Sequence, residues 1–238
     1  MAVLADRVEY TYNRLGEVIE KKDQNGTVHQ YARDGRGRPT ADKITTLGAG
    51  VDGAVRRIAR TYEVRGMVEK ITSYDAASGG NAVNEVLFEY DSLGLVTKEY
   101  QEHAGAKGGN TPYVGYSYDA SASGGQFTKA LRPTSLRYPN GRLVHSTYGS
   151  SGSSADALHR IAAIHDDDSG TPGSALAEYS YLGQGHIVQV DCPEPDLRFD
   201  LAHGGGSDPY EGPLDRFGEL KGSGVFHTAS CYSSFFPA

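Results

Sequence analysis

The chain has 238 residues and a formal net charge of −7 at pH 7, which argues against a nucleic-acid partner, since nucleic-acid binding needs a basic face. No apolar run approaches the roughly 20 residues of a membrane-spanning helix. Glycine accounts for 31 residues and tyrosine for 16, while tryptophan is absent, a composition that favours short strands joined by tight turns.

The first predicted element is a strand at the start of the chain. Val8, Tyr10 and Tyr12 alternate with polar residues, which is the period-2 pattern of a half-buried strand. Asn13 then begins a four-residue turn that Gly16 closes. Asparagine or aspartate is favoured at the first position of such a turn, and glycine accepts the positive φ at its end.

Two Asn-Gly pairs predict a second kind of turn. Asn25-Gly26 stands before the strand-like residues 27–31, and Pro139-Asn140-Gly141 stands before another apolar run. Asn-Gly is a strong signal for a two-residue hairpin because both residues tolerate positive φ. We therefore expect tight turns at 25–26 and at 139–141.

The strand–turn–strand unit recurs along the chain. Its clearest copies are Tyr12-x-x-x-Gly16, Tyr62-x-x-x-Gly66 and Tyr90-x-x-x-Gly94, and valine stands two places after each glycine. Weaker copies place the glycine at 37, 185 and 218, with successive spacings of 21, 29, 28, 91 and 33. Spacings of 20–50 residues indicate an array of supersecondary units. The predicted structural repeat positions are Tyr12, Asn13, Gly16, Asp34, Gly37, Tyr62, Gly66, Tyr90, Asp91, Gly94, Asn140, Gly141, Tyr181, Gly185 and Gly218.

These patterns predict an all-β fold, an elongated antiparallel meander of stacked hairpins. One hairpin buries too little surface to be stable alone, so we expect the hairpins to stack edge to edge into one curving sheet. The repeat domain is expected over 1–220, regular in 7–100 and irregular in 101–220, with an irregular tail at 221–238. Loop insertions are expected at 48–55, 75–84 and 102–112, and the best helical candidate is 156–164.

The densest polar cluster is residues 159–170, with two histidines and Asp166, Asp167 and Asp168 in a row. Carboxylates and imidazoles suit a divalent cation, but the spacing matches neither an EF-hand nor His-Glu-x-x-His. We favour an acidic turn that closes a hairpin and ends at Ser169-Gly170, because carboxylates and glycine are common turn residues.

No other constellation indicates catalysis. Asp34, Asp91 and Asp119 recur at one repeat position, which suggests turn capping, because an active site needs one arrangement and not several equivalent ones. The two cysteines, Cys192 and Cys231, do not form a disulfide scaffold, and no nucleophile elbow or phosphate-binding glycine loop is present. We therefore expect no catalytic residue, no cofactor and no metal.

The repeats carry a family resemblance. The segments "YTYNRLGEVIEKKDQNGTVHQYARDGRGRP" and "FEYDSLGLV" resemble the YD repeats of the Rhs family, in which a Tyr-Asp pair is followed by a glycine and a second tyrosine. The resemblance runs densely over residues 7–150 and thins towards 220. The chain lacks the Asp-Pro-x-Gly cleavage signature of the family, because "SDPYEG" has glutamate, Glu211, in place of that glycine.

The resemblance implies a structural and non-enzymatic role. Family members form a spiral β-shell that encloses a C-terminal toxin or, in animal relatives, a cell-surface barrel, so this chain is expected to be a segment of an incomplete shell. The partners it implies are further repeat sheet of the same or a longer chain, and a toxin cargo or a surface glycan. A secreted or cell-surface location follows from the resemblance alone, since no signal peptide is visible. The alternative is a carbohydrate-binding module that stacks exposed tyrosines on sugar rings.

Overall fold

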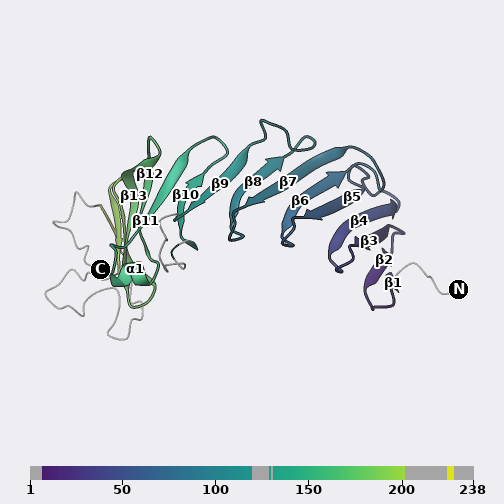
Figure 1. The fold of residues 1–238 in the computed structure, drawn as a ribbon, viewed down its shortest axis with the longest axis horizontal. Helices are drawn as coiled ribbons and strands as arrows, with labels where there is room; N and C mark the ends of the chain where they lie inside the picture. The colour runs from purple at the N-terminus through teal and green to yellow at the C-terminus, as the bar shows by residue number, and fades with distance from the viewer. Residues whose placement is uncertain (1–6, 120–128, 130, 202–223, 228–238) are drawn as a thin grey trace, which may run out of the picture. The chain divides into compact units, whose positions relative to one another are not determined.

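A computed structural model describes residues 7–119, 129 and 131–201, and it describes the backbone of residues 224–227. The contacts divide the chain into two compact units, Met1–Gly115 and Tyr116–Ala238. Within each unit every strand pairs antiparallel with the next strand along the chain (Figure 1). This arrangement confirms the predicted all-β antiparallel meander.

The first unit contains eight complete strands and the start of a ninth. They are β1 (Glu9–Tyr12), β2 (Val18–Lys22), β3 (Val28–Arg33), β4 (Pro39–Thr46), β5 (Arg57–Tyr62), β6 (Val68–Tyr74), β7 (Ala82–Tyr90), β8 (Val96–Glu102) and β9 (Tyr113–Tyr118). β1 is the first strand in the order and pairs with β2 alone among the described strands.

The second unit continues the same pattern with strands of four to twelve residues. They are β10 (Pro133–Arg137), β11 (Leu143–Tyr148), β12 (Ile161–Asp168), β13 (Thr171–Leu182), β14 (His186–Cys192), β15 (Leu197–Asp200) and β16 (Gly224–His227). A one-turn helix, α1 (Ser154–Ala157), lies in the connection between β11 and β12. The prediction of one repeat domain over 1–220 stays a prediction.

The helical prediction for 156–164 is wrong over most of its length. α1 ends at Ala157, and His159 takes a left-handed φ of 54°, which stops the helix. From Ile161 the chain is strand β12, which is paired on both sides, with β11 and with β13. Pairing on two sides satisfies the backbone along the whole segment, and this outweighs the weak local helical tendency of the alanines.

Six turns among the described residues share one five-residue geometry. The first residue donates its N–H to the carbonyl of the fifth, and the glycine at position four donates to the carbonyl of the first. Each of these glycines has a φ between 78° and 98°. The turns are Asn13–Glu17, Asp23–Thr27, Asp34–Arg38, Glu63–Met67, Asp91–Leu95 and Tyr138–Arg142.

The side chain of the first residue explains the preference for aspartate or asparagine there. In four of the six turns its Oδ1 accepts the N–H of both the third and the fifth residues, as Asp91 does from Leu93 at 2.8 Å and from Leu95 at 2.9 Å. A short carboxylate or amide reaches both amides without leaving the turn. Glu63 is longer, and its Oε1 accepts from Met67 alone, at 3.2 Å.

The prediction of two-residue hairpins at the Asn-Gly pairs is wrong. Asn25-Gly26 and Asn140-Gly141 occupy the third and fourth positions of five-residue turns, because the glycine bonds back to Asp23 or Tyr138. The two-residue hairpin lies instead at Ser169-Gly170, where both residues have positive φ, 54° and 90°. It closes the β12–β13 hairpin, and Asp166, Asp167 and Asp168 belong to β12.

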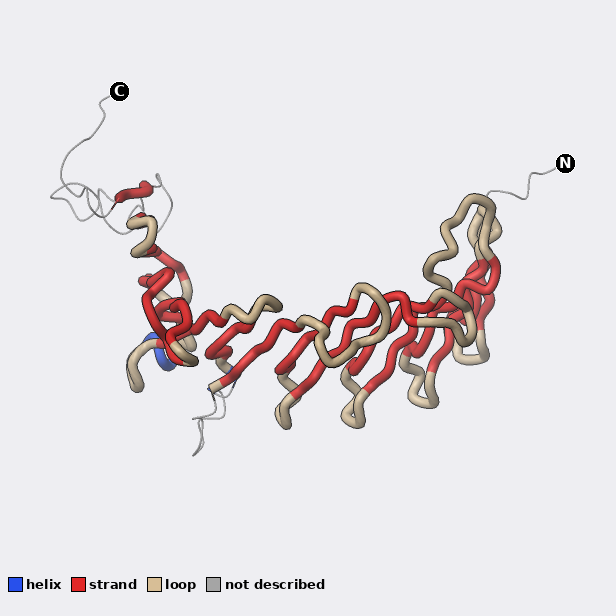
Figure 2. Tube along the Cα trace, turned by 90° about the horizontal axis from the view of Figure 1, so that it is seen from above, coloured by secondary structure: helices blue, strands red, loops and turns tan. Residues whose placement is uncertain are grey.

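The two ends of the strands in the first unit differ. The turns at 13–17, 34–38, 63–67 and 91–95 each follow an odd-numbered strand and lie together at one end, which we call the short-turn end (Figures 1 and 2). The opposite end carries the turn at 23–27 and the loops at 47–56, 75–81 and 103–112. The glycine spacings of 21, 29 and 28 residues are therefore the lengths of one full hairpin with its loop. The predicted loop at 75–84 is too long, since β7 begins at Ala82.

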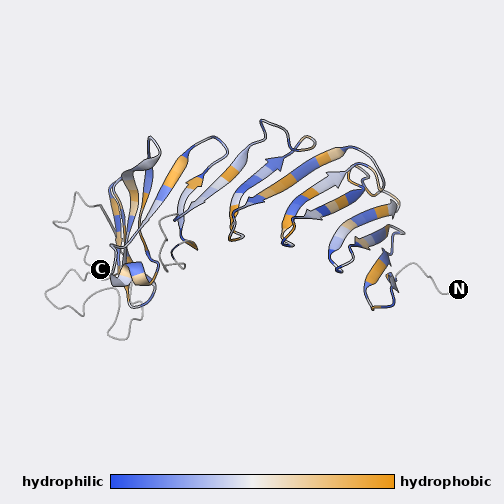
Figure 3. Cartoon of the chain, in the orientation of Figure 1, coloured by the Kyte–Doolittle hydropathy of each residue, from blue (hydrophilic) through white to orange (hydrophobic). Residues whose placement is uncertain are grey.

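Neither unit is built around a large apolar core. No large side chain among the described residues is less than 2% exposed, and the buried apolar residues are Ala41, Tyr100, Ala163 and Val188. Apolar and polar segments alternate along the strands (Figure 3). Contacts between neighbouring strands must therefore supply most of the stability, since cross-strand pairs are the stabilising unit of a sheet.

Candidate functional site

A tyrosine contact between neighbouring strands recurs in both units. In each case a tyrosine that is the last or the second-last residue of an odd-numbered strand donates its hydroxyl to the carbonyl of the first residue of the strand before it. We call this contact a tyrosine bridge. The bridges are Tyr62 to Pro39 at 2.7 Å, Tyr90 to Val68 at 2.6 Å, Tyr148 to Pro133 at 2.9 Å and Tyr181 to Ile161 at 2.8 Å.

A local bulge aims each bridging tyrosine. The strand register shifts immediately before Tyr62, Tyr90, Tyr148 and Tyr181. A bulge bends a strand and redirects the side chain at that position, here towards the neighbouring strand. The bridges of Tyr62 and Tyr90 join two successive hairpins of the first unit. The bridges of Tyr148 and Tyr181 instead join the two strands of one hairpin, β10–β11 and β12–β13.

An arginine covers the ring in three of the four bridges. The residue before the carbonyl acceptor is arginine, and its guanidinium carbon lies 4.2 to 5.2 Å from the ring centroid. This distance is within the range of a cation–π contact. The pairs are Arg38 with Tyr62, Arg132 with Tyr148 and Arg160 with Tyr181.

The remaining bridge uses different neighbours. Met67 precedes the acceptor Val68, and its Sδ lies 3.3 Å from where a Cβ on Gly94 would stand. Arg65 Nη1 donates to the Asp91 carbonyl at 2.7 Å, which ties the turn at 63–67 to the turn at 91–95.

In three of the four bridges the tyrosine hydroxyl is protected from ionisation. Burial raises the pKa of Tyr90, Tyr148 and Tyr181 above the ordinary tyrosine value. A hydroxyl that must stay protonated to donate is favoured by removal from water, because desolvation penalises the charged form. The arrangement therefore holds each hydroxyl as a donor at neutral pH.

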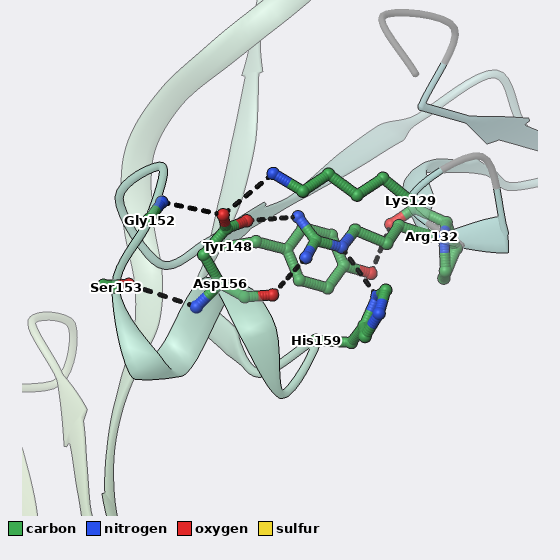
Figure 4. Close-up of polar contacts among 8 residues, drawn as sticks. Lys129, Arg132, Tyr148, Gly152, Ser153, Asp156 and His159 are labelled. Atoms are coloured by element: carbon green, nitrogen blue, oxygen red, sulfur yellow. Dashed lines mark hydrogen bonds and ion pairs between the residues drawn. The ribbon is translucent and has the colours of Figure 1, made fainter. Parts of the chain in front are cut away.

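One bridge in the second unit extends into a buried ionic cluster around Asp156 (Figure 4). The Asp156 carboxylate accepts from Lys129 Nζ at 2.8 Å, from Arg132 Nη1 at 2.8 Å and from the Gly152 N–H at 3.0 Å. Arg132 also donates to the Asp156 carbonyl and, through Nε, to His159 Nδ1 at 2.9 Å. The side chains of Arg132 and Asp156 are 5% and 7% exposed.

This cluster fixes the connection between β11 and β12. The hydrogen bond from Lys129, the Gly152 amide and Arg132 hold the pKa of Asp156 well below its usual range, and the carboxylate therefore stays charged. Both oxygens of that carboxylate are engaged, which leaves it poorly suited to act as a general base. The arrangement can hold α1 against the start of β10, under the bridging Tyr148.

Sequence reasoning missed this cluster. Arg132 and Asp156 lie 24 residues apart, and neither belongs to a motif with a fixed spacing. The only signal is the Arg-Pro pair at 132–133, which repeats the Arg-Pro pair at 38–39 that sits beside another bridge.

The other polar cluster, at 159–170, is divided among separate contacts. His165 contacts the Gly173 carbonyl and the Thr147 hydroxyl, both at 3.0 Å, while Asp167 bonds His145 Nε2 at 2.7 Å. Within the ranges that the structure describes, no group of three or more His, Cys, Asp or Glu side chains is arranged to hold a metal ion.

The predicted repeat positions occupy several distinct places. Asn13, Gly16, Asp34, Gly37, Gly66, Asp91 and Gly94 form the turns of the short-turn end, and Tyr62, Tyr90 and Tyr181 form bridges. Tyr12 ends β1, with half of its surface exposed. Gly218 and Cys231 lie outside the described residues.

Two predicted positions need correction. Gly185 does not have the positive φ expected of the repeat glycine, which lies at Gly183 with a φ of 61°. The β13–β14 connection has three residues, and its turn therefore reverses earlier than the five-residue turns do. Asn140 is predicted in a two-residue hairpin, but it is the third residue of a five-residue turn, where its Oδ1 accepts the N–H of Arg142 at 3.0 Å.

The fold and the bridges define a class of protein, a repeat sheet in which a recurring tyrosine joins neighbouring strands. No known protein-family profile matches the chain. The chain is 27% identical over 218 residues to the tRNA nuclease WapA of Bacillus subtilis, and 24% identical over 218 residues to the tRNA3(Ser)-specific nuclease WapA of Bacillus spizizenii. Each alignment covers 77% of this chain, which spans only 8% of either relative.

Solved structures with a related arrangement share little sequence. The pore of the Photorhabdus luminescens Tc holotoxin matches 93% of this chain and 11% of its own, with a TM-score of 0.47 and 12% identity. A crystal structure of TcdB2-TccC3 matches 92% and 11%, with a TM-score of 0.46 and 12% identity. Separately, none of the described helices has the length and apolar character needed to cross a membrane.

Proposed function

We propose that the chain is a non-enzymatic structural module, a segment of an Rhs-like β-shell that belongs with a toxin in a longer protein. The observation that carries this proposal is the recurrence of the tyrosine bridge in both units, each time to the carbonyl of the first residue of the preceding strand. Side chains that repeat at one position and bond backbone carbonyls serve the geometry of the sheet. A catalytic constellation would instead appear once.

The curated relatives support the toxin part of the proposal. Both carry the name of a nuclease, and this chain aligns with a short part of each. Under the proposal, this chain corresponds to their repeat sheet and leaves the nuclease chemistry to another part of the longer protein. Its partners are then further repeat sheet and a toxin cargo.

A chimera tests this role. The segment of Bacillus subtilis WapA that aligns with this chain is replaced by this chain, and a second variant of WapA has the segment deleted. If the module is structural, the chimera resists trypsin and keeps its nuclease activity on tRNA, whereas the deletion loses the resistance. A chimera as sensitive to trypsin as the deletion would contradict the proposal. Cleavage of tRNA by the isolated chain would contradict its non-enzymatic part.

A carbohydrate-binding role is the second candidate, and it depends on two side chains. Tyr10 and Tyr12 are 50% and 55% exposed, with ring centroids 6.4 Å apart. Tyr62 and Tyr90 do not continue this pair as a row of free rings, because both are engaged in bridges. A glycan array that gives a saturable signal, lost in Tyr10→Ala and Tyr12→Ala, would favour this second role.

A further inference from the structure

The sequence that contains β1 resembles the sequence of β5, a strand that pairs with the strand before it. Residues 7–12 read "RVEYTY", and residues 57–62, which include all of β5, read "RIARTY". Both segments begin with arginine and a β-branched residue and end in Thr-Tyr. Both lead directly into a five-residue turn, at 13–17 and at 63–67.

The backbone of β1 repeats the geometry of β5 as well. The register shifts between Thr11 and Tyr12 as it does between Thr61 and Tyr62. This bulge is the feature that aims a tyrosine at the preceding strand. The turn glycines match too, with φ of 78° at Gly16 and 98° at Gly66.

The two strands differ in what lies on their outer side. β5 pairs with β4, and Tyr62 donates to Pro39 beneath the Arg38 guanidinium. β1 pairs with β2 alone, and within the described residues the Tyr12 hydroxyl has no hydrogen-bond partner. Among the described strands, β1 therefore has the sequence and bulge of β5 but no strand paired on its outer side.

In β3 an arginine occupies the position that the bridging tyrosine has in β5. Arg33 ends β3 after the same register shift, and its Nε lies 3.4 Å from Glu17 Oε1 of the preceding hairpin. The position is therefore used for a contact with the previous hairpin even where the side chain is charged. Tyr12 is the exception in the first unit, with its ring exposed to solvent.

We infer that the outer side of β1, the side away from β2, is a docking site for the second strand of another β-hairpin. In that hairpin an arginine stands immediately before the first residue of the docking strand. That residue accepts the Tyr12 hydroxyl through its carbonyl, and the arginine covers the Tyr12 ring. The Arg-Pro and Arg-Ile pairs at 38–39, 132–133 and 160–161 define this chemistry. The inference rests on the proposed structural function and specifies the partner of one edge.

An edge strand is the expected place for such an interaction. Its unpaired N–H and C=O groups are a template for another strand, and main-chain hydrogen bonds supply the affinity. The β4–β5 interface indicates which kind of strand binds here. The sequence of β5, which β1 resembles, already pairs there with a strand that follows an arginine. A sugar stacked on Tyr10 and Tyr12 would compete for this site.

The experiment adds a hairpin to the full chain. A second copy of residues 28–56, which contains β3, the turn at 34–38, β4 and the loop at 47–56, replaces residues 1–6 and joins directly to Arg7. The junction reproduces the native one, since residue 56 is followed by Arg57 in the chain. Amide hydrogen exchange is then measured across β1 and across β5 as an internal reference.

We expect the added hairpin to slow exchange of the outward-facing β1 amides at least tenfold, towards the rates found in β5. Tyr12→Phe should weaken this protection roughly fivefold in the extended chain and leave the parent unchanged. Tyr10→Phe is the matched control, and it should have no effect in either chain. A copy with Arg38→Gln in the added hairpin should protect less well.

The inference is overturned if the β1 amides exchange as fast in the extended chain as in the parent, or if Tyr12→Phe and Tyr10→Phe behave alike. An added hairpin that stays unfolded counts against it too, because an isolated hairpin is expected to fold only by docking. In any of these cases unchanged protection of β5 to β7 leaves the proposed structural function intact. Loss of the WapA chimera's trypsin resistance tests that function separately.

Discussion

Replacing Tyr90 with phenylalanine removes one hydroxyl and leaves the ring in place. The lost contact is the 2.6 Å hydrogen bond to the Val68 carbonyl, which joins the β7–β8 hairpin to the β5–β6 hairpin. Ring packing, including the neighbouring Phe88, is kept. The variant therefore measures the hydrogen bond of one tyrosine bridge with little disturbance of the sheet.

The expected cost is moderate. A neutral hydrogen bond contributes about 0.5–1.5 kcal/mol net, because water competes for both partners in the unfolded chain. Tyr90 is only half-buried, so water can reach the freed Val68 carbonyl and the cost should not rise far above about 1 kcal/mol. With a urea m-value of about 2 kcal/mol/M, this lowers the midpoint by roughly 0.5 M.

The assay is urea unfolding followed by circular dichroism, with Tyr12→Phe as the matched control. The Tyr12 ring is 55% exposed and its hydroxyl bonds nothing among the described residues, so we expect a change below about 0.5 kcal/mol. The reasoning fails if Tyr90→Phe unfolds at the same urea concentration as the parent, or if the two variants lose equal stability.

Three further outcomes are expected. Gly183→Ala should destabilise the protein by roughly 1–2 kcal/mol in urea melts, because Gly183 has a left-handed φ of 61°. Gly185→Ala should be tolerated, and a larger loss of stability for Gly185→Ala than for Gly183→Ala would contradict the assigned turn. Asp156→Asn should destabilise the protein at pH 7 and make its stability depend less on acid pH. The Asp156 pKa is depressed in the folded state, so the parent loses the stability that the charged carboxylate contributes as the pH falls below about 4. An unchanged dependence of stability on acid pH would refute the cluster's role. The raised pKa values of the bridging Tyr90, Tyr148 and Tyr181 make the protein lose stability at alkaline pH instead. The unfolded chain deprotonates first, so the urea midpoint should fall above pH 10, and less so after each tyrosine is changed to phenylalanine.

The repeat is readable in the sequence because its turns are local. An aspartate or asparagine that bonds two amides within five residues, and a glycine with positive φ, leave a signal that needs no distant partner. The copy at Asp23–Thr27 carries the same signal, but the Asn-Gly pair inside it suggests a shorter turn. The glycine is the fourth residue counted from Asp23, and this spacing distinguishes the five-residue turn from the shorter one.

The contacts between neighbouring strands cannot be read in the same way. The partners of the bridges are 15 to 23 residues apart, and the acceptor is a backbone carbonyl that leaves no trace in the sequence. The sequence shows the recurring tyrosines but not what their hydroxyls bond. Arg132 and Asp156 meet only because β10 and the connection after β11 are brought together by strand pairing.

The central claim is that the tyrosine bridges, and not tyrosine content, hold neighbouring strands of the sheet together. The direct measurement compares two triple variants by urea unfolding. One changes the bridging Tyr62, Tyr90 and Tyr148 to phenylalanine, and the other changes the exposed Tyr10, Tyr12 and Tyr138. The account predicts a loss of about 3 kcal/mol, summed over the transitions, for the bridging set and little change for the exposed set. Equal losses in the two variants would contradict it.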